Sequence, residues 1–345
     1  MSNEKDFLYC RDVLQTCRDE AAKRIVGQSA AVDGILTALL CDGHILLEGV
    51  PGLAKTLAVK TFAEIASLDY KRIQFTPDLL PADITGTLVY EQSSGHFSVR
   101  KGPVFTNVLM ADEINRSPAK VQSALLEAMA ERQVTIGEQS LALPQPFFVM
   151  ATQNPIEQEG TYNLPEAELD RFLLKIILDY PAADEELAII KSGGKAEQIP
   201  VKRVLNAETI ALCRSLLEQI TCGDDIIRYI VSLVNVTRPD KKNVFVKLQT
   251  SVKMPGASAQ TFNREKPDIL KYIAFGVSPR AGIALCRCAK AQALFAGRSF
   301  VLPEDVKAAA PAVLRHRLIL SYEAAADGID ADELIKRILA LMPVP

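Results

Sequence analysis

The segment Gly49-Val50-Pro51-Gly52-Leu53-Ala54-Lys55-Thr56 decides the fold of this chain. It follows a short apolar run, His44 to Glu48, and precedes a helical run that begins at Leu57. A phosphate-binding loop, G-x-x-x-x-G-K-[ST], occurs in this same context of strand, loop and helix. Its backbone N–H groups and the start of the helix point at phosphate oxygens. Residues 49–57 are therefore predicted to bind the phosphates of a nucleotide.

Two side chains of the loop have separate predicted roles. Lys55 supplies a positive charge to the phosphates, and the Thr56 hydroxyl is a suitable ligand for Mg²⁺. Ala54 departs from the motif, where glycine is usual. We expect Ala54 to begin the helix with a negative φ, which alanine adopts without strain.

The first two-thirds of the chain alternates short apolar strands with helical segments. This alternation predicts an α/β fold of the P-loop NTPase type, with a parallel sheet covered by helices on both faces. Each predicted strand is largely apolar and short enough to be buried. The five strands are residues 44–48, 72–76, 107–111, 147–152 and 172–178.

An acidic pair follows the third predicted strand. Asp112 and Glu113 come after Val108-Leu109-Met110-Ala111, at the carboxyl edge of the sheet, where ligands bind in this class of fold. Asp112 would hold Mg²⁺ through its water ligands, and Glu113 would orient and polarise the water that attacks the terminal phosphoryl group. Taken alone, the pair also suits a helix N-cap.

Two segments within this region are predicted to be hairpins, residues 86–100 and 133–143. After about Pro181 the pattern becomes helical without convincing strands. We expect an N-terminal helix at 1–22, a nucleotide-binding core at 23–182, a linker at 183–205 and a smaller helical lid domain at 206–345. A long insertion is expected within the lid at about 239–267.

Composition excludes several classes of function. The chain has 345 residues, of which 48% are hydrophobic and 23% charged, with a net charge of -3. This balance is typical of a globular protein and does not favour nucleic-acid binding. The sequence predicts no transmembrane segment and no secretory signal, which favours a cytoplasmic protein. Seven scattered cysteines and three histidines lack disulfide-framework or zinc-site spacing.

Four further motifs, taken with the loop, resemble the MoxR family of AAA+ ATPases. The similarity extends over nearly the whole chain, apart from the N-terminal helix and the predicted insertion. The motifs are Ile25-Val26-Gly27-Gln28, Met110 to Arg116, Ala151-Thr152-Gln153-Asn154-Pro155 and residues 164–172.

The resemblance implies roles for individual residues. Val26 and Gly27 correspond to the backbone segment beside adenine, and Asn154 to sensor 1. Arg171 corresponds to an arginine finger that a neighbouring subunit inserts, and Arg280 to sensor 2. Taken one at a time, Asn154 also suits an Asn-Pro turn, Arg171 a surface ion pair with a nearby carboxylate, and Arg280 a solvated side chain at a helix start.

The function implied by the resemblance is Mg²⁺-dependent ATP hydrolysis that drives remodelling of a partner protein. The implied assembly is a ring, expected to be hexameric, and the implied client carries a von Willebrand factor A domain. Three alternatives stay open: a magnesium-chelatase-like motor subunit, a nucleotide-gated scaffold with little hydrolysis, and a helicase. A helicase would bind DNA in a salt-sensitive way, which the net negative charge does not favour.

Overall fold

The computed structural model describes residues 2–93, 95–155, 160–238 and 269–345. Contacts divide the chain into two units. The sheet unit is Asp12–Arg214, and the helical unit is Met1–Arg11 together with Ser215–Pro345. The predicted insertion at 239–267 lies outside the described residues. No helix in the described ranges is long and apolar enough to cross a membrane.

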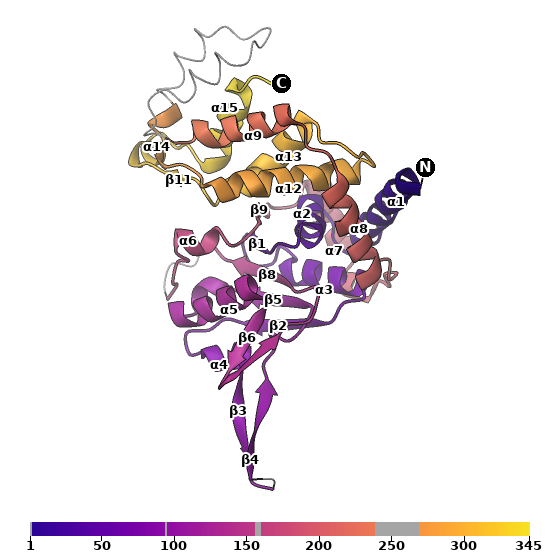
Figure 1. Cartoon of the computed structure of the whole chain (residues 1–345), viewed down its shortest axis with the longest axis vertical. Coiled ribbons are helices and arrows are strands. Elements are labelled where there is room, and N and C mark those ends of the chain that lie inside the picture. Colours follow the sequence, from indigo (N-terminus) through magenta and orange to yellow (C-terminus); the bar gives the residue numbers. More distant parts are fainter. Residues whose placement is uncertain (1, 94, 156–159, 239–268) are drawn as a thin grey trace. The chain divides into compact units, whose positions relative to one another are not determined.

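Five parallel strands form the centre of the sheet unit, in the spatial order β2-β5-β8-β1-β9 (Figure 1). The five predicted strands and the parallel α/β fold are therefore confirmed. Because the strands are parallel, their carboxyl ends meet along one edge, which is where ligands bind in open α/β sheets. The strands are β1 (Ile45–Glu48), β2 (Tyr70–Gln74), β5 (Val108–Asp112), β8 (Phe148–Gln153) and β9 (Leu174–Ile177).

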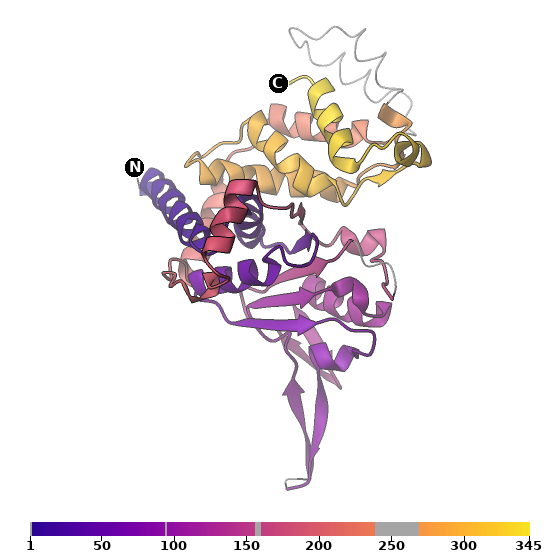
Figure 2. The ribbon, with the colours of Figure 1, turned by 180° about the vertical axis from the view of Figure 1, so that it is seen from behind.

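Helices cover both faces of this sheet, as Figures 1 and 2 show. Successive strand residues point to opposite faces. On one face Leu109 and Val149 belong to a buried cluster with Leu125 of α5 (Ala119–Glu131). On the other face Phe148 meets Phe62 of α3 (Lys55–Ile65) with ring centroids 6.5 Å apart. The helix α2 (Ser29–Leu40) contacts β1 and β9.

The strand β2 differs from the prediction. It begins two residues earlier than expected, lies at one edge of the sheet and is not a buried apolar strand. Only Ile73 of its five residues is buried. An edge strand pairs on one side only, so its polar side chains do not have to enter the core.

Both predicted hairpins are confirmed. The first pairs β3 (Gly86–Glu91) with β4 (His96–Lys101), and it extends away from the sheet in both views (Figures 1 and 2). It follows the short helix α4 (Pro81–Thr85). The second pairs β6 (Gln133–Ile136) with β7 (Gln139–Ala142).

The stretch predicted as a linker contains the helix α7 (Ala183–Lys191) and a short 3₁₀ turn at Ala196–Gln198. Another short helix, α6 (Glu166–Leu169), precedes β9. Two helices span the boundary between the units, α1 (Ser2–Ala22) and α8 (Ala207–Gln219).

The helical unit packs its long helices around a separate core. Leu233, Leu285, Val306 and Leu334 are all fully buried, and each comes from a different helix. The prediction of no strands is wrong in detail, because β10 (Ile273–Phe275) pairs with β11 (Ile319–Leu320). The helices are α9 (Asp224–Val236), α12 (Pro279–Phe295), α13 (Pro303–Leu314), α14 (Tyr322–Ala326) and α15 (Ala331–Leu341).

Candidate active site

The phosphate loop and the acidic pair line one open cavity of about 640 Å³ in the sheet unit. Lys55 and Thr56 of the loop thus come together with Asp112 and Glu113, although the two pairs are far apart in the chain. Gly49, Val50 and Leu53 are not among the lining residues, and Leu53 is buried. The cavity is lined by Pro51, Gly52, Ala54, Lys55, Thr56, Leu57, Lys60, Tyr70, Arg72, Asp112, Glu113 and Glu197.

The backbone of Ala54 contradicts the prediction of a negative φ. Its φ is 55° and its ψ 22°, which is the left-handed conformation, and the helix α3 starts only at Lys55. Glycine adopts this conformation freely, whereas a Cβ makes it unfavourable by roughly 1–2 kcal/mol. The usual glycine at this position of the motif is therefore explained, and alanine introduces strain beside the phosphate site.

Lys55 is held at the mouth of the loop by backbone oxygens. Its Nζ donates to the Gly49 carbonyl at 2.6 Å and to the Gln153 carbonyl at 3.3 Å. Gly49 follows β1, and Gln153 ends the neighbouring strand β8. The ammonium group is thus placed over the carboxyl ends of two adjacent strands, on the side where the cavity opens.

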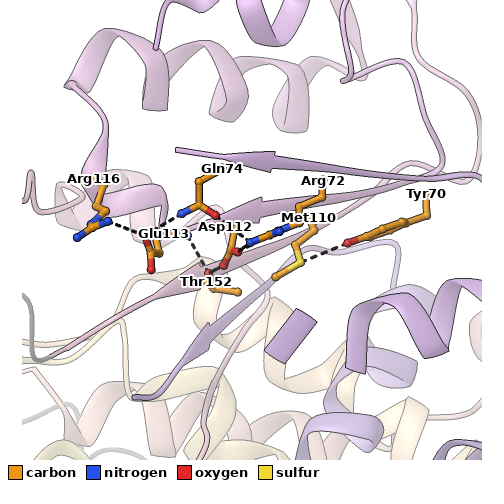
Figure 3. A network of polar contacts seen from close by, with 8 residues as sticks. All are labelled: Tyr70, Arg72, Gln74, Met110, Asp112, Glu113, Arg116 and Thr152. Carbon is orange, nitrogen blue, oxygen red and sulfur yellow. Dashed lines mark hydrogen bonds and ion pairs between the residues drawn. The ribbon is translucent and has the colours of Figure 1, made fainter. Parts of the chain in front are cut away.

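Asp112 is the centre of a network of polar contacts, drawn in Figure 3. Its Oδ1 accepts from the Thr152 hydroxyl at 2.6 Å, and its Oδ2 accepts from Arg72 Nε at 3.0 Å. The Thr152 Oγ1 also accepts from the backbone N–H of Glu113 at 2.8 Å. The fully buried Thr152 therefore ties together the two carboxylate residues.

Glu113 also has a left-handed backbone, with φ at 56°. Its Oε2 accepts from Gln74 Nε2 at 2.8 Å and lies 3.2 Å from Arg116 Nη1. Arg72 Nη2 donates to Gln74 Oε1 at 2.9 Å, so a chain of contacts runs from Asp112 through Arg72 and Gln74 to Glu113. The two carboxylates are thereby coupled through the edge strand β2 (Figure 3).

Asn154 lies beside a second cavity, of about 460 Å³, that is lined mainly by amides. It follows the end of β8 and is 3% exposed. Asn115 shares this cavity, and its Oδ1 is buried without a hydrogen-bond partner in the described part of the chain. The cavity is lined by Glu48, Asn115, Gln153, Asn154, Pro155, Thr161 and Asn163.

The remaining predicted residues lie outside both cavities. Gly27 has a φ of 75°, and Gln28 next to it donates to the Asp179 carbonyl at 2.9 Å. Arg171 is exposed, and its Nη1 donates to the Leu126 carbonyl at 2.8 Å. Arg280 is in the first turn of α12 in the helical unit, after the N-cap Ser278, as predicted. The nucleotide roles of Val26, Gly27, Arg171 and Arg280 remain predictions.

Sequence reasoning missed the contribution of β2. Tyr70, Arg72 and Gln74 alternate along the strand, so their side chains share one face. Burial raises the pKa of the Tyr70 phenol. The signal was available in the polar residues at every second position, but the assumption of a buried strand hid it. Lys60 and Glu197, which pair at the rim of the cavity, were also missed.

Comparison with known proteins agrees with this architecture. Residues 44–174 match the ATPase family associated with various cellular activities (AAA), and residues 269–338 match the AAA lid domain. The crystal structure of a Cytophaga hutchinsonii protein is similar over 100% of this chain and 98% of its own, with a TM-score of 0.85 and 44% identity. The match therefore covers both units.

Curated relatives identify the branch of the family. Chaperone MoxR1 of Mycobacterium tuberculosis is 44% identical over 94% of this chain and 81% of its own length. Protein MoxR of Paracoccus denitrificans is 31% identical over 93% of each chain. With a phosphate loop, an acidic pair at the end of β5 and a helical lid in place, the chain belongs to the MoxR family of AAA+ ATPases.

Proposed function

We propose that the chain binds ATP with Mg²⁺ at the 640 Å³ cavity and hydrolyses the terminal phosphoanhydride bond. The observation that carries this proposal is the convergence of Lys55, Thr56, Asp112 and Glu113 on one open cavity. Cation, hydroxyl and carboxylates are the groups that phosphoryl transfer requires, and they meet at the start of a helix.

The donor set fits Mg²⁺. The Thr56 hydroxyl and the Asp112 carboxylate are hard oxygen donors, and both line the cavity. They would hold the ion, which would neutralise charge on the β- and γ-phosphates when bound. Loop N–H groups and Lys55 would orient the phosphates, with Gly49 to Leu57 as the binding segment and Val26 and Gly27 beside adenine.

Glu113 would act as the general base. Its carboxylate is on the loop after β5, and it would accept a proton from the water that attacks the terminal phosphorus. In this structure the carboxylate is engaged by Gln74 and Arg116, so the side chain has to turn away from them to reach a substrate water. Asn154, one strand away, would position that water or the phosphate.

We further propose that Arg171 acts from a neighbouring subunit in a ring, expected to be hexameric, and that Arg280 contacts the nucleotide from the lid. Exposure of Arg171 supports this proposal, because a residue that reaches into another subunit must be accessible. The relative named Chaperone MoxR1 supports remodelling of a protein client as the output. A client with a von Willebrand factor A domain is the specific expectation.

The test is steady-state ATP hydrolysis by purified chain at several protein concentrations, with and without Mg²⁺. We expect specific activity to rise with protein concentration and to fall at least a hundredfold in Glu113→Gln, since general-base contributions are about 10²–10⁴-fold. Hydrolysis that Glu113→Gln leaves intact would refute the assigned base. Binding of ATP without hydrolysis in the wild-type chain would instead favour the scaffold alternative.

A further inference from the structure

Both oxygens of the Asp112 carboxylate are already engaged by the protein. Thr152 donates to Oδ1, while Arg72 reaches Oδ2 through Nε and Nη2 (Figure 3). The Thr152 contact is neutral and buried, and it leaves the carboxylate charge uncompensated. The Arg72 contact is an ion pair, so a guanidinium occupies the position of a counter-cation.

The geometry of this ion pair would allow the Arg72 guanidinium to be replaced at Asp112 by another cation. The Asp112 side chain is 11% exposed, whereas the Arg72 side chain is 47% exposed. Both residues line the same cavity, together with Thr56. Because Arg72 comes from an edge strand, its side chain can leave Asp112 for solvent without disturbing the core. Asp112 cannot follow, since Thr152 and the buried strand β5 fix it.

We propose that Arg72 is a built-in competitor of Mg²⁺ for Asp112, and thereby sets the magnesium concentration at which nucleotide binds productively. This inference rests on the proposed function. Two cations a few ångströms apart repel one another, and an intervening carboxylate oxygen cannot neutralise both. A magnesium water ligand that needs Oδ2 therefore has to displace the guanidinium. Arg72 acts as a positioning residue, since it acts through Asp112.

The experiment measures binding of a fluorescent N-methylanthraniloyl-ADP while Mg²⁺ is varied. The chain contains no tryptophan, so the nucleotide signal has no indole background. The variant is Arg72→Met, which keeps the length of the side chain and removes its charge. The matched control is Arg116→Met, because Arg116 is similarly exposed and pairs within the same network, but with Glu113. Arg72→Lys tests rescue by a retained charge.

The half-saturating Mg²⁺ concentration should fall about three- to tenfold in Arg72→Met, as expected for loss of a partly exposed, charge-assisted pair. It should change less than twofold in Arg116→Met and return toward wild type in Arg72→Lys. Affinity measured in EDTA should be unchanged in Arg72→Met, since Arg72 is assigned no phosphate contact.

An unchanged or raised magnesium midpoint in Arg72→Met would overturn the inference, and so would weaker binding in EDTA, which would make Arg72 a phosphate ligand. If the wild-type chain binds nucleotide, neither of these two results for Arg72→Met contradicts the proposed function. A wild-type chain that binds no nucleotide would overturn the proposed function and this inference together. Thermal unfolding of each variant verifies that it is folded.

Discussion

Ala54 shows how a single φ angle can carry information that a motif leaves implicit. The motif uses glycine there because the last residue before α3 is left-handed, with φ at 55°. A sequence motif does not specify φ, and as the first residue of a helix with a negative φ, alanine would be unstrained. The phosphate loop of this chain thus contains a strained residue, Ala54, at a position where the usual motif has glycine.

Replacement of Ala54 by glycine should therefore increase stability. Relief of left-handed strain by about 1–2 kcal/mol exceeds the added entropy of the unfolded chain, about 0.4–1 kcal/mol. Ala130, which is exposed within α5, is the matched control, and Ala130→Gly should destabilise by about 0.5–1 kcal/mol. Urea unfolding of the two variants checks the opposite signs. A loss of stability in Ala54→Gly would show that no strain is stored there.

His44 predicts an acid-sensitive core. Burial and nearby Arg132 lower its pKa to about 3, and Val149 N–H donates to Nδ1 at 3.1 Å, which requires an unprotonated Nδ1. Below pH 6.5 the unfolded chain takes up a proton on this residue that the folded chain does not. Stability therefore falls as the pH drops from 7 toward 3, by about 2 kcal/mol at pH 5.

Denaturant unfolding at pH 7 and pH 5 measures this loss. In His44→Gln the side chain cannot be protonated, so the variant should be less stable at pH 7 but should lose much less stability between the two pH values. An equal pH dependence in wild type and variant would assign the acid sensitivity to other groups.

At the scale of elements, the β3–β4 hairpin is fixed at its base by two glycines. A Cβ on Gly102 would lie 2.2 Å from the Ile84 carbonyl oxygen, and one on Gly86 would lie 2.3 Å from the Arg100 oxygen. These contacts are with backbone, which cannot rotate away as a side chain can. The close approach joins α4 to the hairpin, and Gly102 N–H donates to the Thr85 carbonyl at 3.2 Å.

Gly102→Ala should consequently destabilise the sheet unit by about 2–3 kcal/mol, within the upper range for single substitutions. Gly95→Ala is the control, because Gly95 at the hairpin tip has a positive φ but open space around it, and should cost about 1 kcal/mol. Urea unfolding distinguishes the two. Equal effects would mean that the base of the hairpin adapts to a side chain.

The elements also show what the sequence could and could not predict. The parallel strands, both hairpins and the start of α12 at Pro279 followed from apolar runs and turn residues. The polar residues at every second position of β2 are visible in the sequence, but they indicate a polar face only once β2 is known to lie at an edge. The spatial order of the strands decides that, and it depends on pairing between segments far apart in the chain. Motif positions predicted Lys55 and Asp112, but not their partners Arg72 and Gln74, which have no motif of their own. Thr152 belongs to a motif, but that motif pointed to Asn154 and not to a contact with Asp112.

At the scale of the whole molecule, we propose that the active site is shared between subunits. The cavity of one chain contains the phosphate loop and Glu113, while Arg171 lies outside its lining. A finger supplied by a neighbour would complete the site, and it would explain why Arg171 is exposed. Under this proposal, hydrolysis would be a property of the assembly and not of the isolated chain.

Subunit mixing tests this claim most directly. Glu113→Gln and Arg171→Ala are each expected to be inactive alone, because one lacks the base and the other the finger. When the two variants are co-assembled, Glu113 of an Arg171→Ala subunit can meet the intact Arg171 of its neighbour. We predict that the mixture recovers a substantial fraction of wild-type ATP hydrolysis. A mixture as inactive as its components, despite verified co-assembly, would contradict a site completed in trans.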